Sequence, residues 1–245
     1  MSLFTGKSRS WLAETELLDL SHPRLSLTVR KLVHSGQRPR ERALTLHSFV
    51  RLIPYAVALD AQPLSASEAL RHYRGDSVAK GTLFVALCRS AGLAARLQFM
   101  RMRSDHLQGI LEHPPATVVH AVSQVLIDGQ WLSTDGYVLD PVLFTRALAR
   151  LAQDGRRAGW GLYRDATPAW TAQAHCLQQV DESDVIHAYG AFDDPAELCA
   201  QRLREGDHPG WMTRATHAVL GRQLLDRRID QLRRAPSTQR RVQVD

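Results

Sequence analysis

Residues 75–92 read GDSVAKGTLFVALCRSAG and predict a single buried helix. Apolar side chains recur along this stretch at helical spacing and form one stripe: Leu83, Phe84, Leu87, Cys88 and Ala91. Gly92 follows, and glycine is the residue that most readily takes the left-handed conformation just after a helix end. The helix is therefore expected to begin at or near Ser77 and to lie in the core.

Two further helices are predicted before this one. Residues 41–53 carry apolar side chains at helical spacing, and Pro54 ends the pattern. Ser65 and Glu68 have the spacing of a capping box, in which each side chain accepts a hydrogen bond from the other residue's backbone amide. A short helix is thus expected from Ser65 to about Tyr73.

A strand and a hairpin are predicted after the buried helix. Residues 96–102 alternate between apolar and polar side chains, which is typical of a strand. Residues 117–127 and 130–138 flank Asp128-Gly129, a dipeptide that favours a two-residue type I′ turn. Such a turn fixes which residues of the two strands face each other.

The hairpin register brings two polar side chains together. It places His120 opposite Tyr137 and Val122 opposite Asp135. Residues 120 and 122 share a strand face, so His120 and Asp135 are diagonal neighbours with Cα atoms about 7–8 Å apart. Their side chains are expected to meet.

Ser77, His120 and Asp135 have the residue types of a catalytic triad. The N-terminus of a helix stabilises negative charge on a nucleophile and on a developing oxyanion. An imidazole within reach can accept the proton of the nucleophile, and a carboxylate on its other nitrogen fixes the tautomer. Taken singly, Ser77 is more typical of a helix cap, His120 of a half-buried histidine and Asp135 of a turn, so only their joint placement predicts a site.

From about Ala43 to Pro141 the chain resembles the transglutaminase-like superfamily of the papain-type cysteine-proteinase fold. The resemblance rests on four blocks taken together: 49–55, 66–80, 91–96 and the segment from His120 through Trp131 to Asp135. It implies an α+β core in which a central helix packs on an antiparallel sheet. It also implies acyl transfer through a covalent intermediate on residue 77, with peptide, amide or acyl-(thio)ester substrates.

One position departs from the pattern of this family, because Ser77 stands where the family has its nucleophilic cysteine. Cys88 cannot replace that cysteine, since it lies about three helical turns on, within the apolar stripe. A thiol ionises readily at a helix terminus, whereas a serine hydroxyl must lose its proton during the attack. The two nucleophiles are therefore not automatically interchangeable.

Three interpretations of Ser77 stay open. In the first, Ser77 is a natural nucleophile with His120 as general base and Asp135 as the residue that orients it. In the second, the chain is an inactivated form of a cysteine enzyme in which serine replaces the nucleophile. In the third, it is a pseudoenzyme that keeps the cleft for binding, although the retention of both His120 and Asp135 argues against this.

The expected organisation is a core with N-terminal helices over residues 1–143 and a mainly helical C-terminal extension over 144–245 that covers or shapes the cleft. Within the extension, helices are predicted at 144–151, from Asp194-Pro195 to 203, and at 211–234. Little strand signal follows Pro141, residues 155–190 show no clear period, and the last eleven residues are expected to fray.

Composition limits the class of protein. The 245 residues include 31 Lys and Arg against 25 Asp and Glu, with 44% hydrophobic residues, which is typical of a globular chain. No apolar run approaches the ~18 residues of a membrane span, and no secretory signal is recognisable, so a cytoplasmic protein without membrane contact is expected. Neither the acyl acceptor nor the oligomeric state follows from the residues.

No metal or organic cofactor is expected. The three cysteines lack a CxxC pair. A group of possible ligands lacks helical or hairpin spacing and is interpreted as a polar loop before Pro114: Asp105, His106, Glu112 and His113.

Nucleic acid is not expected as a partner. Residues 201–245 carry ten Arg against five Asp and Glu. Both signs intermix there at helical spacing, and almost no aromatic residues are present to stack bases, which favours a solvated helix face.

Overall fold

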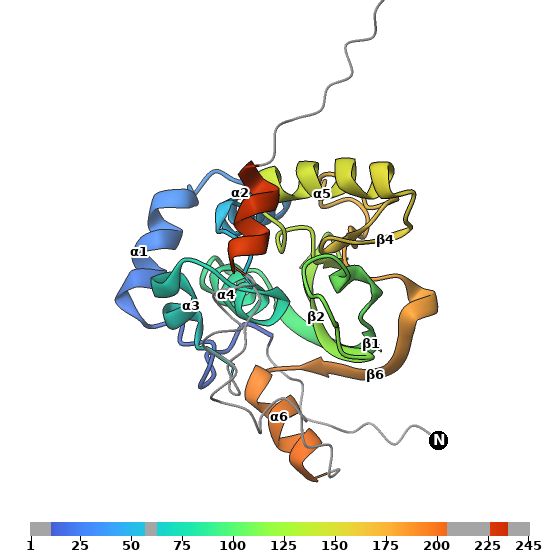
Figure 1. Cartoon of the computed structure of the whole chain (residues 1–245). Helices are drawn as coiled ribbons and strands as arrows, with labels where there is room; N and C mark the ends of the chain where they lie inside the picture. Colours follow the sequence, from blue (N-terminus) through green and yellow to red (C-terminus); the bar gives the residue numbers. More distant parts are fainter. Residues whose placement is uncertain (1–10, 57–62, 205–225, 235–245) are drawn as a thin grey trace, which may run out of the picture.

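A four-stranded antiparallel sheet and a central buried helix organise the molecule (Figure 1). The computed structural model describes residues 11–56, 63–204 and 226–234. The strand order is β3-β2-β1-β6, and helix α4 packs against β1 and β2. Helices α1, α2 and α3 contact α4 as well. The predicted α+β fold, with a central helix on an antiparallel sheet, is confirmed.

Four helices form the N-terminal half: α1 (Pro23–Leu32), α2 (Pro39–Leu52), α3 (Ala66–His72) and α4 (Ser77–Ser90). The Ser65 hydroxyl accepts from the Glu68 amide at 3.3 Å, and the Glu68 carboxylate accepts from the Ser65 amide at 3.0 Å, which confirms the capping box. Gly92 has φ +76°, as expected after a helix end.

Helix α4 is buried along almost its whole length, because the sheet and the other N-terminal helices enclose it. Gly81 allows a close approach to the sheet. A Cβ there would lie 2.9 Å from Leu97 Cδ2 and 3.0 Å from the Tyr137 hydroxyl. This packing fixes the N-terminus of α4 beside β2.

The hairpin forms in the predicted register but is shorter than expected. Strands β1 (Ala95–Arg103), β2 (Thr117–Ile127) and β3 (Gln130–Thr134) pair antiparallel. Asp128 and Gly129 have φ +50° and +80°, as a type I′ turn requires. The β2–β3 ladder ends at the Ser123–Thr134 pair, so the expected pairs of His120 with Tyr137 and of Val122 with Asp135 do not form. After Thr134 the chain turns, and the Asp135 amide donates to the Cys176 carbonyl instead.

The C-terminal part contains α5 (Pro141–Asp154), the short β4 (Ala158–Gly159) and β5 (Leu162–Tyr163), β6 (Val185–Phe192) and α6 (Pro195–Arg204). Residues 226–234 are also helical. Helix α5 begins three residues before the predicted start, because Asp140 caps it. The rest of the predicted 211–234 helix, and residues 235–245, lie outside the described residues.

Strand β6 was not predicted, and it corrects the expectation of little strand after Pro141. It pairs with β1 at the sheet edge with two register shifts, and Gly190 takes φ +97°. These irregularities, together with a largely exposed surface, remove the alternation by which a strand is recognised. The sheet therefore includes residues from beyond position 143.

Among the residues that the structure describes, no helix is both long and apolar enough to cross a bilayer.

Candidate functional site

Ser77 is the first residue of α4, as the sequence predicts, but it is not the cap of that helix. The Asp76 carboxylate caps α4 by accepting from the Val78 and Ala79 amides at 3.0 and 3.1 Å. The Ser77 hydroxyl is therefore not occupied with capping, which is the role most typical of a serine at this place. Its side chain is buried, with 7% of the residue exposed.

The Ser77 hydroxyl faces the backbone of β2. The amide of Ala121 donates to Ser77 Oγ at 3.4 Å. This amide is available because β3 ends at Thr134, opposite Ser123, and so does not extend alongside Ala121. The peptide bond that supplies this amide joins His120 to Ala121, so the hydroxyl contacts the backbone directly after His120.

His120 and Asp135 are in contact, as predicted, although the strand pairs from which that contact was expected do not form. His120 Nε2 and Asp135 Oδ2 are 3.1 Å apart, and the two residues are 2% and 0% exposed. An ionised carboxylate can only accept hydrogen bonds, so this contact places the proton of the neutral imidazole on Nε2. The other ring nitrogen, Nδ1, is left as a proton acceptor.

Two backbone amides from the C-terminal part hold the Asp135 carboxylate. The Gln178 amide donates to Oδ1 at 2.6 Å and the Gln179 amide donates to Oδ2 at 3.0 Å. Residues 176–179 run beside the end of β3, where Cys176 bridges Thr134. Sequence reasoning missed this segment, because backbone donors carry no side-chain signal.

Lys80 anchors the first turn of α4. Its ammonium is fully buried and donates to the carbonyls of Ile53 at 2.7 Å and Val138 at 2.8 Å. Burial lowers the pKa of Lys80 well below its usual value. These two bonds connect the start of α4 to the end of α2 and to Val138, three residues after Asp135.

The helix at residues 226–234 docks near the first turn of α4. Arg233, from helix 226–234, donates to the Asp140 carboxylate at 2.6 Å and to the Tyr55 carbonyl at 2.8 Å. Arg74, three residues before Ser77, forms an ion pair with Asp226. Part of the charge in the basic tail is thus paired within the molecule.

His106 lies beside His120, which corrects its interpretation as part of a polar loop. It sits in η1 (Asp105–Leu107), a single 3₁₀ turn, and is 2% exposed. Its ring centroid is 6.1 Å from that of His120. The segment folds inward because its apolar neighbours Leu107 and Ile110 are buried. Residues 105–110 show no helical or strand period from which this burial could be predicted.

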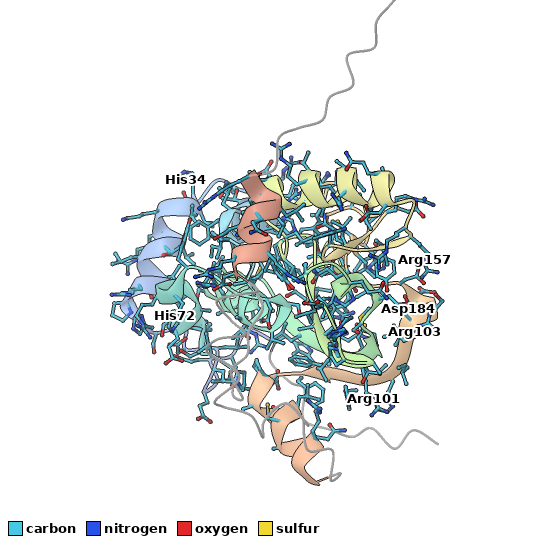
Figure 2. All side chains as sticks on the ribbon, in the orientation of Figure 1. His34, His72, Arg101, Arg103, Arg157 and Asp184 are labelled. Carbon is cyan, nitrogen blue, oxygen red and sulfur yellow. The ribbon has the colours of Figure 1, made fainter. Side chains whose placement is uncertain are left out.

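The ring of Tyr163 also lies near His106, with ring centroids 6.4 Å apart. The Tyr163 hydroxyl donates to Asp184, which also accepts from Arg103 and Arg157. Figure 2 shows Arg103, Arg157 and Asp184 gathered at one side of the molecule. A charged network at the surface is therefore linked through Tyr163 to the two histidines.

Neither buried thiol can act in place of Ser77. Cys88 is fully buried in α4, and burial raises the pKa of its thiol. Cys176 lies next to Thr134, and burial together with the Asp135 charge raises the pKa of its thiol to about 12. Both thiols therefore stay protonated at neutral pH and are poor nucleophiles.

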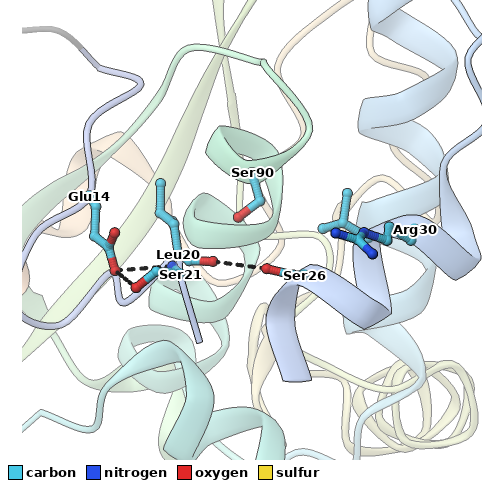
Figure 3. A pocket seen from close by; sticks show the side chains of 7 residues that line it. Glu14, Leu20, Ser21, Ser26, Arg30 and Ser90 are labelled. Atoms are coloured by element: carbon cyan, nitrogen blue, oxygen red, sulfur yellow. Dashed lines mark hydrogen bonds between the residues drawn. The ribbon is translucent and has the colours of Figure 1, made fainter. Parts of the chain in front are cut away.

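One cavity lies away from these residues. It has a volume of about 410 Å³ and is lined by residues from the N-terminal segment, α1 and the end of α4 (Figure 3). Ser90, at its wall, is the last residue of α4, so this cavity is about 20 Å along the helix from Ser77. It is not part of the Ser77 site.

Comparison with known proteins finds a match over the part of the chain that contains Ser77, His120 and Asp135. Residues 27–136 match the family model of the transglutaminase-like superfamily. Among solved structures, the chain is similar to a proposed cysteine protease from Cytophaga hutchinsonii, with 20% identity and a TM-score of 0.43. That match covers 54% of this chain and 42% of the other. A proposed protease from Parabacteroides distasonis has 12% identity and a TM-score of 0.36, over 47% of this chain and 24% of the other.

The chain thus spans less than half the length of either of these two proteins. A search of curated proteins found no match. The family model covers α2, α3, α4, β1, β2 and β3 and ends one residue after Asp135. Residues 27–136, a little under half of the chain, are therefore similar to the transglutaminase-like superfamily.

Proposed function

We propose that the protein is an acyl-transfer enzyme that forms a covalent acyl intermediate on Ser77. The observation that carries the proposal is the arrangement around α4. Asp76 takes over the capping of the helix, and the Ser77 hydroxyl lies against β2 next to His120, whose ring is hydrogen-bonded to Asp135. Nucleophile, base and orienting carboxylate therefore come from the start of α4, from β2 and from the residue that follows β3.

In the proposed reaction, Ser77 Oγ attacks the carbonyl carbon of an amide, ester or thioester while His120 Nδ1 takes the hydroxyl proton. The tetrahedral intermediate collapses, and His120 returns that proton to the departing amine, alcohol or thiol. Water or an amine then attacks the acyl group on Ser77, and His120 again takes and returns one proton. Asp135 holds the ring in the tautomer that both half-reactions need.

Negative charge that develops on the carbonyl oxygen would lie at the N-terminus of α4. A helix of fourteen residues has a positive dipole end there. This end favours an oxyanion near Ser77. The residues themselves thus supply nucleophile, proton transfer and charge stabilisation.

The second candidate is a binding protein of the same fold without turnover. It is favoured by the hydroxyl in place of a thiol and by the burial of both Ser77 and His120. A third candidate, the inactivated form of a cysteine enzyme, shares all the geometry above. The three differ only in what residue 77 can do.

Release of p-nitrophenol from p-nitrophenyl acetate separates the three candidates. It is to be measured for the protein and for its Ser77→Ala and Ser77→Cys variants. We expect release by the protein and by the cysteine variant, and none above the solvent background with alanine. Release only by Ser77→Cys would support the inactivated enzyme. Absence of release from all three would remove acyl transfer and leave the binding protein.

A further inference from the structure

His106 is the one histidine ring recorded in contact with His120 within the described part of the chain. The planes of the two rings are inclined by 73°, so one ring presents its edge to the face of the other. The position of His106 is itself fixed by its backbone, because its carbonyl accepts from the Gly161 amide at 2.7 Å. The ring of Tyr163 also lies near it, with ring centroids 6.4 Å apart.

The contact with Asp135 does not by itself fix the orientation of His120. One hydrogen bond at Nε2 holds that atom, but the imidazole can still tilt about the bond. Across the strand, His120 is paired with Met100, whose flexible side chain is a poor guide for a ring. A rigid ring against His120, such as that of His106, restricts the tilt and so fixes where Nδ1 points.

His106 also stays uncharged next to a ring that must gain a proton. Burial, together with the nearby His120, lowers the pKa of His106 to about 3. Two adjacent imidazolium ions would repel each other, whereas a neutral ring does not oppose protonation of His120. His106 can therefore support His120 in both protonation states.

We propose that His106 is a positioning residue, whose neutral ring sets the plane of the His120 imidazole so that Nδ1 faces residue 77. The catalytic consequence rests on the proposed acyl transfer; the positioning of His120 does not. Only the ring surface is required, so phenylalanine should replace His106 and alanine should not. His106 Nδ1 is moreover buried with no hydrogen-bond partner among the described residues. A His106→Phe variant, which lacks that nitrogen, is thus expected to melt at the same or a higher temperature.

The test compares His106→Ala and His106→Phe, with Leu25→Ala in α1 as the control for a loss of core packing. The first readout is p-nitrophenyl acetate turnover, measured on whichever form of residue 77 is active. His106→Ala is expected to lower kcat by about tenfold or more with little change in KM, because a misplaced base slows the reaction and not the binding. His106→Phe should keep most of kcat, and Leu25→Ala should lower the melting temperature only.

The second readout needs no activity. The ¹⁵N shifts of the two His120 ring nitrogens, assigned by their loss in a His120→Gln variant, report its tautomer and surroundings. They are expected to change in His106→Ala and to stay close to the parent values in Leu25→Ala. If no form of the protein turns over but these shifts change as stated, the proposed function fails and the positioning stands. Unchanged shifts in His106→Ala, or a His106→Phe variant as slow as His106→Ala, would overturn the inference.

Discussion

Replacing His120 by alanine is expected to lower the rate of acyl transfer by about 10²–10⁴-fold. In the proposed mechanism, His120 is the group that takes the proton of residue 77. The ring is buried, so bulk water cannot readily substitute for it. The measurement is p-nitrophenol release under single-turnover conditions, with the form of residue 77 that shows turnover.

His72→Ala is the matched control, because His72 is an exposed histidine on α3 (Figure 2). It should leave the rate unchanged within about twofold, as expected of a surface substitution. A His120→Ala variant that keeps the parent rate would show that acylation of residue 77, if it occurs, does not use this imidazole.

Replacing Asp135 by alanine is expected to destabilise the whole core. The fully buried carboxylate accepts from His120 and from the Gln178 and Gln179 amides. Without it, two buried backbone amides lose their partner, and each such loss costs about 1–3 kcal/mol. The free energy of unfolding should therefore fall by about 2–6 kcal/mol in urea denaturation.

Asp165→Ala provides the comparison, since Asp165 is exposed in the same half of the chain. Its effect should stay within about 0.5 kcal/mol. If Asp135→Ala unfolded at the same urea concentration as the parent, the carboxylate would not be the point that joins residues 176–179 to the core. The account of how the C-terminal part completes the site would then be wrong.

Features that depend on neighbouring residues could be predicted from the sequence. The capping box at Ser65 and Glu68, the start of α4 at Ser77 and the turn at Asp128-Gly129 each rest on contacts within a few residues. The hairpin turn also brings the ends of its two strands close together, and His120 contacts Asp135 as expected, although the pairs predicted beyond Ser123 and Thr134 do not form. Local rules were thus sufficient for the side chains that sequence analysis singled out.

Features that depend on distant contacts could not be predicted in the same way. β6 is an irregular edge strand whose partner is nearly ninety residues away in the sequence. The Gln178 and Gln179 amides hold Asp135 through backbone atoms that every residue type except proline has. His106 reaches His120 only because the fold buries its whole segment.

The role of Ser77 at the start of α4 differs from the role that a serine most often has there. A serine at a helix start is usually a cap, and on sequence alone that interpretation of Ser77 is the stronger one. In the structure Asp76 caps the helix, and the hydroxyl of Ser77 contacts the β2 backbone instead. The simplest structural role for Ser77 is therefore already filled by its neighbour.

The most direct test is the mass of the intact protein after incubation with p-nitrophenyl acetate, followed by peptide mapping. One added acetyl group is expected, located on residue 77, with a higher yield in Ser77→Cys and none at this position in Ser77→Ala. An adduct found only on lysines or other surface groups, with residue 77 unmodified in both the parent protein and Ser77→Cys, would contradict the account.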